Sequence, residues 1–360
     1  MADRDNNFDT LRLAAASSVV LTHAFLLGED RLSPDPLMRL TGGQCDMGVA
    51  GVFVFFTISG YLVTQSFAAT GRVLPFLAKR ALRIYPGLAV CLMLLAFVVG
   101  PAVSRLPLAA YFAAAGNYRF VALNLSMVAA MHGLPAVNFT SLGNGWVVDG
   151  PLWSLPCEVL MYLMVAALGA LRLVRGPVLA ALFAAGLVAN MLGTTSYGIV
   201  GSAAWLLPFF VAGMALWKFR ALPLLRGRYA IAALGALALA ARFGGFIPVF
   251  AACGSYLVIY LACARYWRFE AARFGDLSYG LYIYGWPVEQ LTVRALGGAA
   301  PGWEVFAIAL PVTALVALLS WHLVEAPALR LKPRGRARVP SFAQYPSPAQ
   351  REALKSVPPG

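Results

Sequence analysis

The chain has 360 residues, of which 60% are hydrophobic and only 12% are charged. That charged fraction is about half of the ~25% typical of soluble domains, so the composition excludes an ordinary soluble protein. The five cysteines are scattered and show neither the spacing of metal ligands nor a disulfide framework. We therefore expect no metal.

Long apolar runs recur along the chain, and a helix needs ~20 mostly apolar residues to cross a bilayer. We predict an all-α integral membrane protein with about ten transmembrane helices. Between residues 106 and 150 the pattern is ambiguous, and an apolar piece at 106–115 suits the membrane interface. In chain order the predicted spans are 9–28, 48–68, 83–103, 152–171, 176–193, 199–217, 229–243, 246–264, 278–297 and 303–325.

Basic residues gather in alternate connections, beginning with the loop between the second and third spans, whereas residues 29–47 are poor in them. Because cytoplasmic loops carry an excess of Lys and Arg, both termini are predicted to face the cytoplasm. This asymmetry accounts for the net charge of +13 without any nucleic acid. Residues 1–331 are predicted to form one membrane-embedded domain, and the basic, Pro-rich residues 332–360 a disordered cytoplasmic tail.

Arg12 and His23 are ionisable residues inside the first span, and such residues default to functional hypotheses. Eleven residues separate them, which places them within ~20° of one helix face and roughly 16 Å apart along the axis. One stripe would carry a cation near the cytoplasmic end and an imidazole toward the outer side. The spacing leaves open an alternative, in which Arg12 snorkels to the inner surface and His23 hydrogen-bonds at the outer one.

Two further patterns lie near the second and third spans. Arg80 and Arg83 share a helix face, which suits a phosphate group, although the pattern alone favours a topological anchor. Ser59 and Gly60 fall in a stretch of small residues, which indicates either a loosened backbone near the membrane middle or ordinary close packing of helices.

The remaining ionisable residues in the spans receive simpler interpretations. Glu158 lies about two turns into the fourth span, where it would pair with an arginine or accept the ring proton of a histidine. Glu289 and Arg294 flank the outer end of the ninth span and are expected to be structural. His322 and Glu325 are expected to form an ion pair at a helix end.

Six short motifs occur in a fixed order along the chain. They are Arg12-(ten residues)-His23, Phe55-Phe56-Thr57-Ile58-Ser59-Gly60, Arg80-Ala81-Leu82-Arg83, Trp153-Ser154-Leu155-Pro156-Cys157-Glu158, Leu277–Tyr284 and Val324-Glu325-Ala326-Pro327. Together they resemble the acyltransferase family 3 membrane proteins, the O-acetylase type acting on lipopolysaccharide and exopolysaccharide, over roughly residues 7–331. Each motif alone is weak, but six in order across ten spans are specific.

The resemblance implies a multi-pass enzyme of the bacterial inner membrane that moves an acyl group, commonly acetyl, from cytoplasmic acyl-CoA to a hydroxyl of an extracytoplasmic or lipid-linked glycan. By motif match, His23 would be the catalytic histidine and Arg12 its family partner, and Glu158 matches the family's acidic catalytic position after the tryptophan. The donor site would include Arg80, Arg83, Ser59 and Gly60. Candidates on the acceptor side are Asp46, Asp149 and Trp153. The acid that orients His23 stays open among Asp46, Asp149 and Glu158.

The chemistry of thioester transfer to an alcohol agrees with a histidine base, and the sequence has no Gly-x-Ser-x-Gly elbow. Direct transfer is therefore favoured, with an acyl-histidine intermediate as the alternative. Many relatives have a histidine where this chain has Gly285, so any role of that histidine is missing here. A transporter or flippase for an acylated glycan is the main rival interpretation, and a non-catalytic scaffold is a third.

Overall fold

The computed structural model describes residues 6–28, 34–140, 145–219, 225–264 and 275–333. Every regular element in these ranges is helical, which confirms the all-α class. Most of the predicted tail, residues 334–360, and part of the basic-poor connection, residues 29–33, lie outside the described residues.

Each of the ten predicted spans coincides with helical structure. In chain order, the first helix of each of the ten stretches is α1 (Phe8–Leu27), α3 (Met47–Thr70), α4 (Val73–Leu94), α8 (Ser154–Ala170), α9 (Gly176–Met191), α10 (Gly198–Lys218), α11 (Gly227–Phe243), α12 (Phe246–Val249), α14 (Ser278–Ala295) and α15 (Gly302–Ser320). Within the described ranges, seven stretches are long and apolar enough to cross a membrane. The other three are α9 and α11, which are shorter, and α14, which is less apolar.

Three of the long stretches contain a π-helical turn. The turn η1 (Leu95–Val99) joins α4 to α5 (Gly100–Val103), η5 (Phe250–Gly254) joins α12 to α13 (Ser255–Cys263), and η7 (Trp321–Glu325) joins α15 to α16 (Ala326–Arg330). Turns of this kind are frequent at functional sites. The last of them ends at Glu325, whose carboxylate takes part in the ion network described below.

Short helices lie between the longer ones, in the loop before α3, in the ambiguous region and in two later connections. They are α2 (Pro36–Leu40), α6 (Leu108–Ala113), α7 (Ala115–Ser126), η2 (Pro151–Trp153) and η3 (Thr194–Tyr197). The start of α3 is fixed by Asp46, whose Oδ1 accepts a hydrogen bond from the backbone N–H of Val49 at 2.6 Å. Its end is marked by Gly71, which has a φ of 65°.

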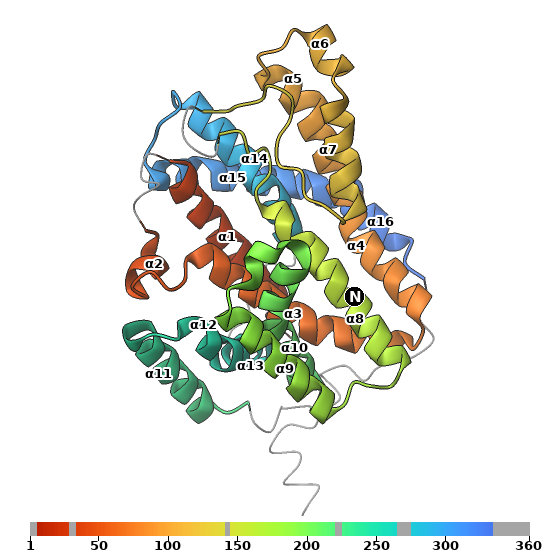
Figure 1. Cartoon of the computed structure of the whole chain (residues 1–360), viewed down its shortest axis with the longest axis vertical. Helices are drawn as coiled ribbons and strands as arrows, with labels where there is room; N and C mark the ends of the chain where they lie inside the picture. The colour runs from red at the N-terminus through yellow and green to blue at the C-terminus, as the bar shows by residue number, and fades with distance from the viewer. Residues whose placement is uncertain (1–5, 29–33, 141–144, 220–224, 265–274, 334–360) are drawn as a thin grey trace, which may run out of the picture.

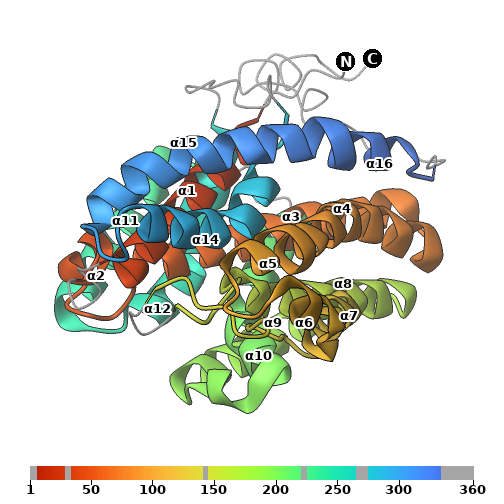
Figure 2. The same ribbon diagram turned by 90° about the horizontal axis from the view of Figure 1, so that it is seen from above.

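The long helix α3 lies at the centre of the bundle, packed on one side against α1 and on the other against α10 (Figure 1). The helix α9 covers α10, while α14 packs against both α1 and α15. Figure 2 shows α15 and α16 running nearly in line along one side of the molecule, with α9 and α10 on the opposite side. The helices α1, α3 and α14 therefore form the interior of the bundle.

Gly60 lies where the backbones of α3 and α10 pack closely together. A Cβ atom at this position would lie 2.0 Å from the carbonyl oxygen of Phe210. The contact is reciprocal, because a Cβ atom at Gly213 of α10 would lie 2.1 Å from the carbonyl oxygen of Thr57. Small residues at such interfaces allow two backbones to touch, and this packing accounts for the glycine.

Candidate active site

The residues Arg12 and His23 of α1 both face the segment that contains α14. Arg12 donates a hydrogen bond to Asp276, two residues before α14 begins, and the His23 ring packs edge-on against Trp286 with ring centroids 4.9 Å apart. The later residue of α1 meets the later residue of α14, so the two helices run parallel. The structure thus divides their shared interface into an arginine end and a histidine end.

The arginine end is a largely buried network of two arginines and two carboxylates. Oδ2 of Asp276 accepts from Nη1 of Arg12 at 2.9 Å and from Nη2 of Arg83 at 2.5 Å. Nη1 of Arg83 also donates to Oε2 of Glu325 at 3.2 Å. Glu325 therefore pairs with an arginine of α4, and the expected pair with His322 is not the one formed.

Asp276 holds the network together through both of its carboxylate oxygens. Its Oδ1 accepts from the hydroxyl of Ser278 at 2.5 Å, while Oδ2 binds the two guanidiniums. Burial alone would raise the pKa of this carboxyl, but Arg12 and Arg83 outweigh burial and hold the pKa of Asp276 well below its usual range. The carboxylate is charged at neutral pH and pairs with both cations.

At the histidine end, His23 faces a carboxylate. Its Nδ1 lies 3.7 Å from Oε2 of Glu289, and the two side chains are 14% and 0% exposed. Both oxygens of Glu289 are buried and have no hydrogen-bond partner, and Nδ1 of His23 is in the same state. The distance is that of an ion pair and is longer than a hydrogen bond.

The three acids expected as partners of His23 have other contacts. Glu158 accepts hydrogen bonds from Ser59 at 3.2 Å and from Tyr162. Asp46 caps α3, and burial raises its pKa. Asp149 is fully buried beside the thiol of Cys91, and burial raises the pKa of this carboxyl well above its usual value. In the described part of the chain, Glu289 is the carboxylate that reaches the imidazole.

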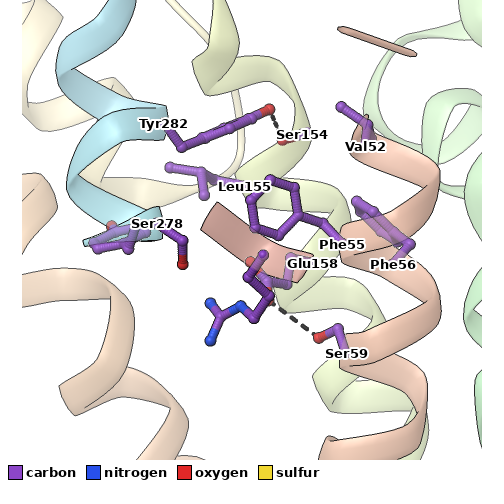
Figure 3. A pocket seen from close by; sticks show the side chains of 11 residues that line it. Val52, Phe55, Phe56, Ser59, Ser154, Leu155, Glu158, Ser278 and Tyr282 are labelled. Carbon is purple, nitrogen blue, oxygen red and sulfur yellow. Dashed lines mark hydrogen bonds between the residues drawn. The ribbon is translucent and has the colours of Figure 1, made fainter. Parts of the chain in front are cut away.

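Two small cavities lie along the interior face of α3, with volumes of about 50 and 70 Å³. Figure 3 shows the first, with Ser59 and Phe55 of α3 facing Glu158 of α8 and Tyr282 of α14. The second extends toward the end of α4 that carries Arg80. Both cavities share one set of lining residues, Arg12, Phe55, Ser59, Glu158 and Tyr279.

The volumes of the two cavities and the contacts between their lining residues limit the size of a ligand that they can hold in this conformation. Each has room for a few water molecules, whereas pockets that hold a drug-sized ligand have ~300–1,000 Å³. In the first, Ser154 and Tyr282 are joined by a hydrogen bond of 2.5 Å between their hydroxyls. A long ligand would therefore enter only if side chains that line the cavities move.

Arg80 and Arg83 differ sharply in their surroundings, although both line the second cavity. The guanidinium of Arg83 is committed to Asp276 and Glu325. Arg80 makes one long hydrogen bond to Ser66, 3.5 Å, and lies over the ring of Tyr162, while its buried Nε has no partner. Of these two cations, Arg80 is the one with capacity left for an anion.

The other sequence-predicted residues are distributed as follows. Ser59 lines both cavities, whereas Gly60 packs against α10. Trp153 is half-buried against the apolar core at the start of α8. Across the described ranges, no group of three or more His, Cys, Asp or Glu side chains is arranged to hold a metal ion.

Asp276 and Glu289 are the site residues that sequence reasoning missed. Asp276 lies two residues before the ninth predicted span and was outside the motif that begins at Leu277. Glu289 was visible as a carboxylate inside a span, which is a functional signal in itself. Its position near the helix end led to the structural interpretation.

The described part of the chain is a helical bundle with seven stretches long and apolar enough to cross a membrane, which is the architecture of a multi-pass membrane protein. A family model for an acyltransferase domain, acyltransferase family 3, matches residues 5–322. The chain belongs to this family and is an acyltransferase.

Three relatives match over nearly their whole length. The O-acetyl transferase of Shigella phage Sf6 is 29% identical over 89% of this chain and 95% of its own. Nodulation protein 10 of Rhizobium leguminosarum bv. viciae is 28% identical over 91% and 94%. The exopolysaccharide production protein ExoZ of Rhizobium meliloti is 29% identical over 83% and 94%. No solved structure matches the chain.

Proposed function

We propose that this protein transfers an acyl group, in the simplest case acetyl, from cytoplasmic acyl-CoA to a hydroxyl of an extracytoplasmic or lipid-linked glycan. The observation that carries the proposal is the shared α1–α14 interface, with a histidine–carboxylate pair at one end and arginines beside a cavity at the other. The names of the phage O-acetyl transferase and of the exopolysaccharide production protein support a polysaccharide acceptor.

Arg80 is the proposed contact for the phosphates of the donor. Its buried, unpartnered Nε and its place beside the second cavity support this role, because a guanidinium binds phosphate through charge-assisted hydrogen bonds. Arg83 lines the same cavity and is proposed to fix the position of the site through Asp276. Ser59 and Glu158 would then line the route along which the acyl-bearing arm of the donor extends.

His23 is the proposed general base. It takes the proton of the acceptor hydroxyl as that oxygen bonds to the carbonyl carbon of the thioester. The carbon–sulfur bond then breaks, and the proton passes from His23 to the departing thiolate. The products are the O-acyl glycan and free CoA, and no acyl-enzyme forms in this direct route.

The orientation proposed for the site follows from the charge pattern of the loops. The arginine end of α1 would face the cytoplasm and the histidine end the outside, in a bacterial inner membrane. The parallel course of α1 and α14 supports this arrangement, because the first and the ninth of ten spans cross in the same direction. The donor and the acceptor would thus approach from opposite sides of the membrane.

Release of CoA by the purified protein distinguishes an acyltransferase from a transporter. With acetyl-CoA and a membrane glycan extract, the wild-type protein is expected to release free thiol together with acetylated glycan. A transporter or scaffold would release none with any acyl donor tried. Labelled acetyl recovered on His23 before acceptor is added would replace direct transfer with an acyl-histidine route.

A further inference from the structure

Glu289 of α14 is a carboxylate without a hydrogen-bond partner in the interior of the bundle. Its side chain is fully buried and neither oxygen has a partner within hydrogen-bond distance. An unpaired buried carboxylate is costly, and a side chain used only for packing would be apolar. The position therefore points to a function that requires a carboxyl group.

The one described ionisable side chain within ion-pair distance of Glu289 is His23, whose Nδ1 is 3.7 Å away. In the described ranges no other side chain forms an ion pair with Glu289, and the buried carboxylate Asp149, next to the η2 turn that also packs against α14, lies beside Cys91. Arg12 of α1 is bound to Asp276, and Glu304 of α15 is exposed. On α14 itself, Arg294 is exposed.

The ring of His23 is held from two directions. The Trp286 indole meets it edge-on at an interplanar angle of 79°, and the indole is itself fixed by a hydrogen bond of 2.8 Å from its Nε1 to the carbonyl of Val147. Nδ1 is shielded and faces Glu289, and 14% of the whole side chain is exposed. This orientation leaves Nε2 for the reacting proton.

We propose that Glu289 is the positioning residue of His23, an inference that rests on the proposed function. A carboxylate that accepts the Nδ1–H of an imidazole keeps Nε2 unprotonated and stabilises the imidazolium that forms when Nε2 takes a proton. Glu289 does both for His23, and Asp46, Asp149 and Glu158 do not. The separation of 3.7 Å shortens to a hydrogen bond when the substrates bind, since catalytic hydrogen bonds are often long in unliganded enzymes.

Kinetics of Glu289→Gln, Glu289→Asp and Glu304→Gln test this role. Glu304→Gln is the matched control, because it neutralises an exposed carboxylate on the neighbouring helix. We expect Glu289→Gln to lower kcat by roughly 100-fold, the scale of general acid–base catalysis, with KM for acetyl-CoA little changed. Glu289→Asp restores part of kcat, because the carboxylate is kept.

The shape of the pH profile separates positioning from folding. In Glu289→Gln the imidazolium loses its counter-charge. The part of the kcat–pH profile that reports the protonation of His23 therefore moves to lower pH. Glu304→Gln keeps the wild-type profile. If Glu289→Gln retains the wild-type kcat and pH profile while His23→Ala is inactive, the positioning role is wrong and the proposed function stands. If the wild-type protein releases no CoA, the proposed function itself fails.

Nitrogen-15 NMR of the histidine side chains gives an independent readout should Glu289→Gln not fold. The chain has three histidines, and replacing His132 and His322 by glutamine leaves the signals of His23 alone. The neutral ring is expected to carry its proton on Nδ1. A proton on Nε2 with an unprotonated Nδ1 would overturn the proposal without any mutation at Glu289.

Discussion

Arg83 of α4 and Asp276, which lie 193 residues apart in the sequence, are joined by a hydrogen bond of 2.5 Å in the interior of the bundle. The same oxygen of Asp276 accepts from Arg12, so α1, α4 and the start of α14 meet at one carboxylate. Glu325, at the end of η7, completes the network through Arg83. Four charged side chains thereby fix the relative positions of the helices that carry the proposed site.

Replacing Arg83 by methionine is expected to destabilise the protein strongly. The side chain of Arg83 is 12% exposed and its guanidinium pairs with two carboxylates, and removing one partner of a buried ion pair costs about 3–5 kcal/mol. Thermal unfolding in detergent measures the effect, with Arg242→Met on the exposed face of α11 as the control. Equal melting temperatures for the two variants would show that the network does not stabilise the fold.

The stability of the protein is expected to fall in acid through Asp276. Its folded-state pKa is depressed, so the stability that it contributes is present above the ordinary Asp value of about 3.9 and is lost as pH falls through the folded-state pKa. The melting temperature of the wild-type protein, followed from pH 7 down to pH 3, reports this loss. Asp276→Asn should have a lower melting temperature than wild type at pH 7, and its melting temperature should change less with pH below pH 4. If the melting temperature of Asp276→Asn falls below pH 4 as steeply as that of wild type, the assignment is contradicted.

Arg80→Ala is expected to weaken acyl-CoA binding more than it slows turnover. The loss of a hydrogen bond to a charged phosphate is worth about 1.5–3 kcal/mol, which corresponds to an increase in KM for acetyl-CoA of roughly 10- to 100-fold. Lys79→Ala, which removes the adjacent cation bound to Thr70, is the control. If both variants change KM equally, Arg80 has no specific role in donor binding.

Gly60→Ala is expected to disturb the contact between α3 and α10. The added methyl group would lie 2.0 Å from the Phe210 carbonyl oxygen, and that backbone is part of a helix and cannot move aside cheaply. Gly235→Ala on α11 provides the comparison, because its methyl group would meet nothing within 4 Å. A lower melting temperature for Gly60→Ala alone supports the packing role, whereas a change in KM without loss of stability would favour the donor site.

The sequence alone was sufficient to predict the positions of the membrane-spanning helices and the shared face of Arg12 and His23 on α1. Apolar runs of span length fix where helices form in a membrane protein, and all ten predicted spans lie on helices. The position of Arg12 and His23 on α1 follows from helix periodicity alone. Rules of local structure therefore predict a single helix and which residues share one of its faces.

The partners of these residues could not be read from the sequence. His23 meets Glu289, and Arg12 meets Asp276, across the α1–α14 interface, and helix periodicity says nothing about which two helices pack together. Arg83 shows the same limit, since its motif is equally compatible with a free phosphate site and with the ion network that it forms. Long-range pairing requires the packed structure.

The most direct test of the account is transfer of radiolabelled acetyl from acetyl-CoA into membrane glycans, with wild type and His23→Ala at matched expression and His322→Ala as a histidine control on the exposed face of η7. We expect label in the glycan fraction with wild type and His322→Ala, and background label with His23→Ala. Equal labelling by wild type and His23→Ala would contradict the account, because the proton of the acceptor hydroxyl would then leave through another group.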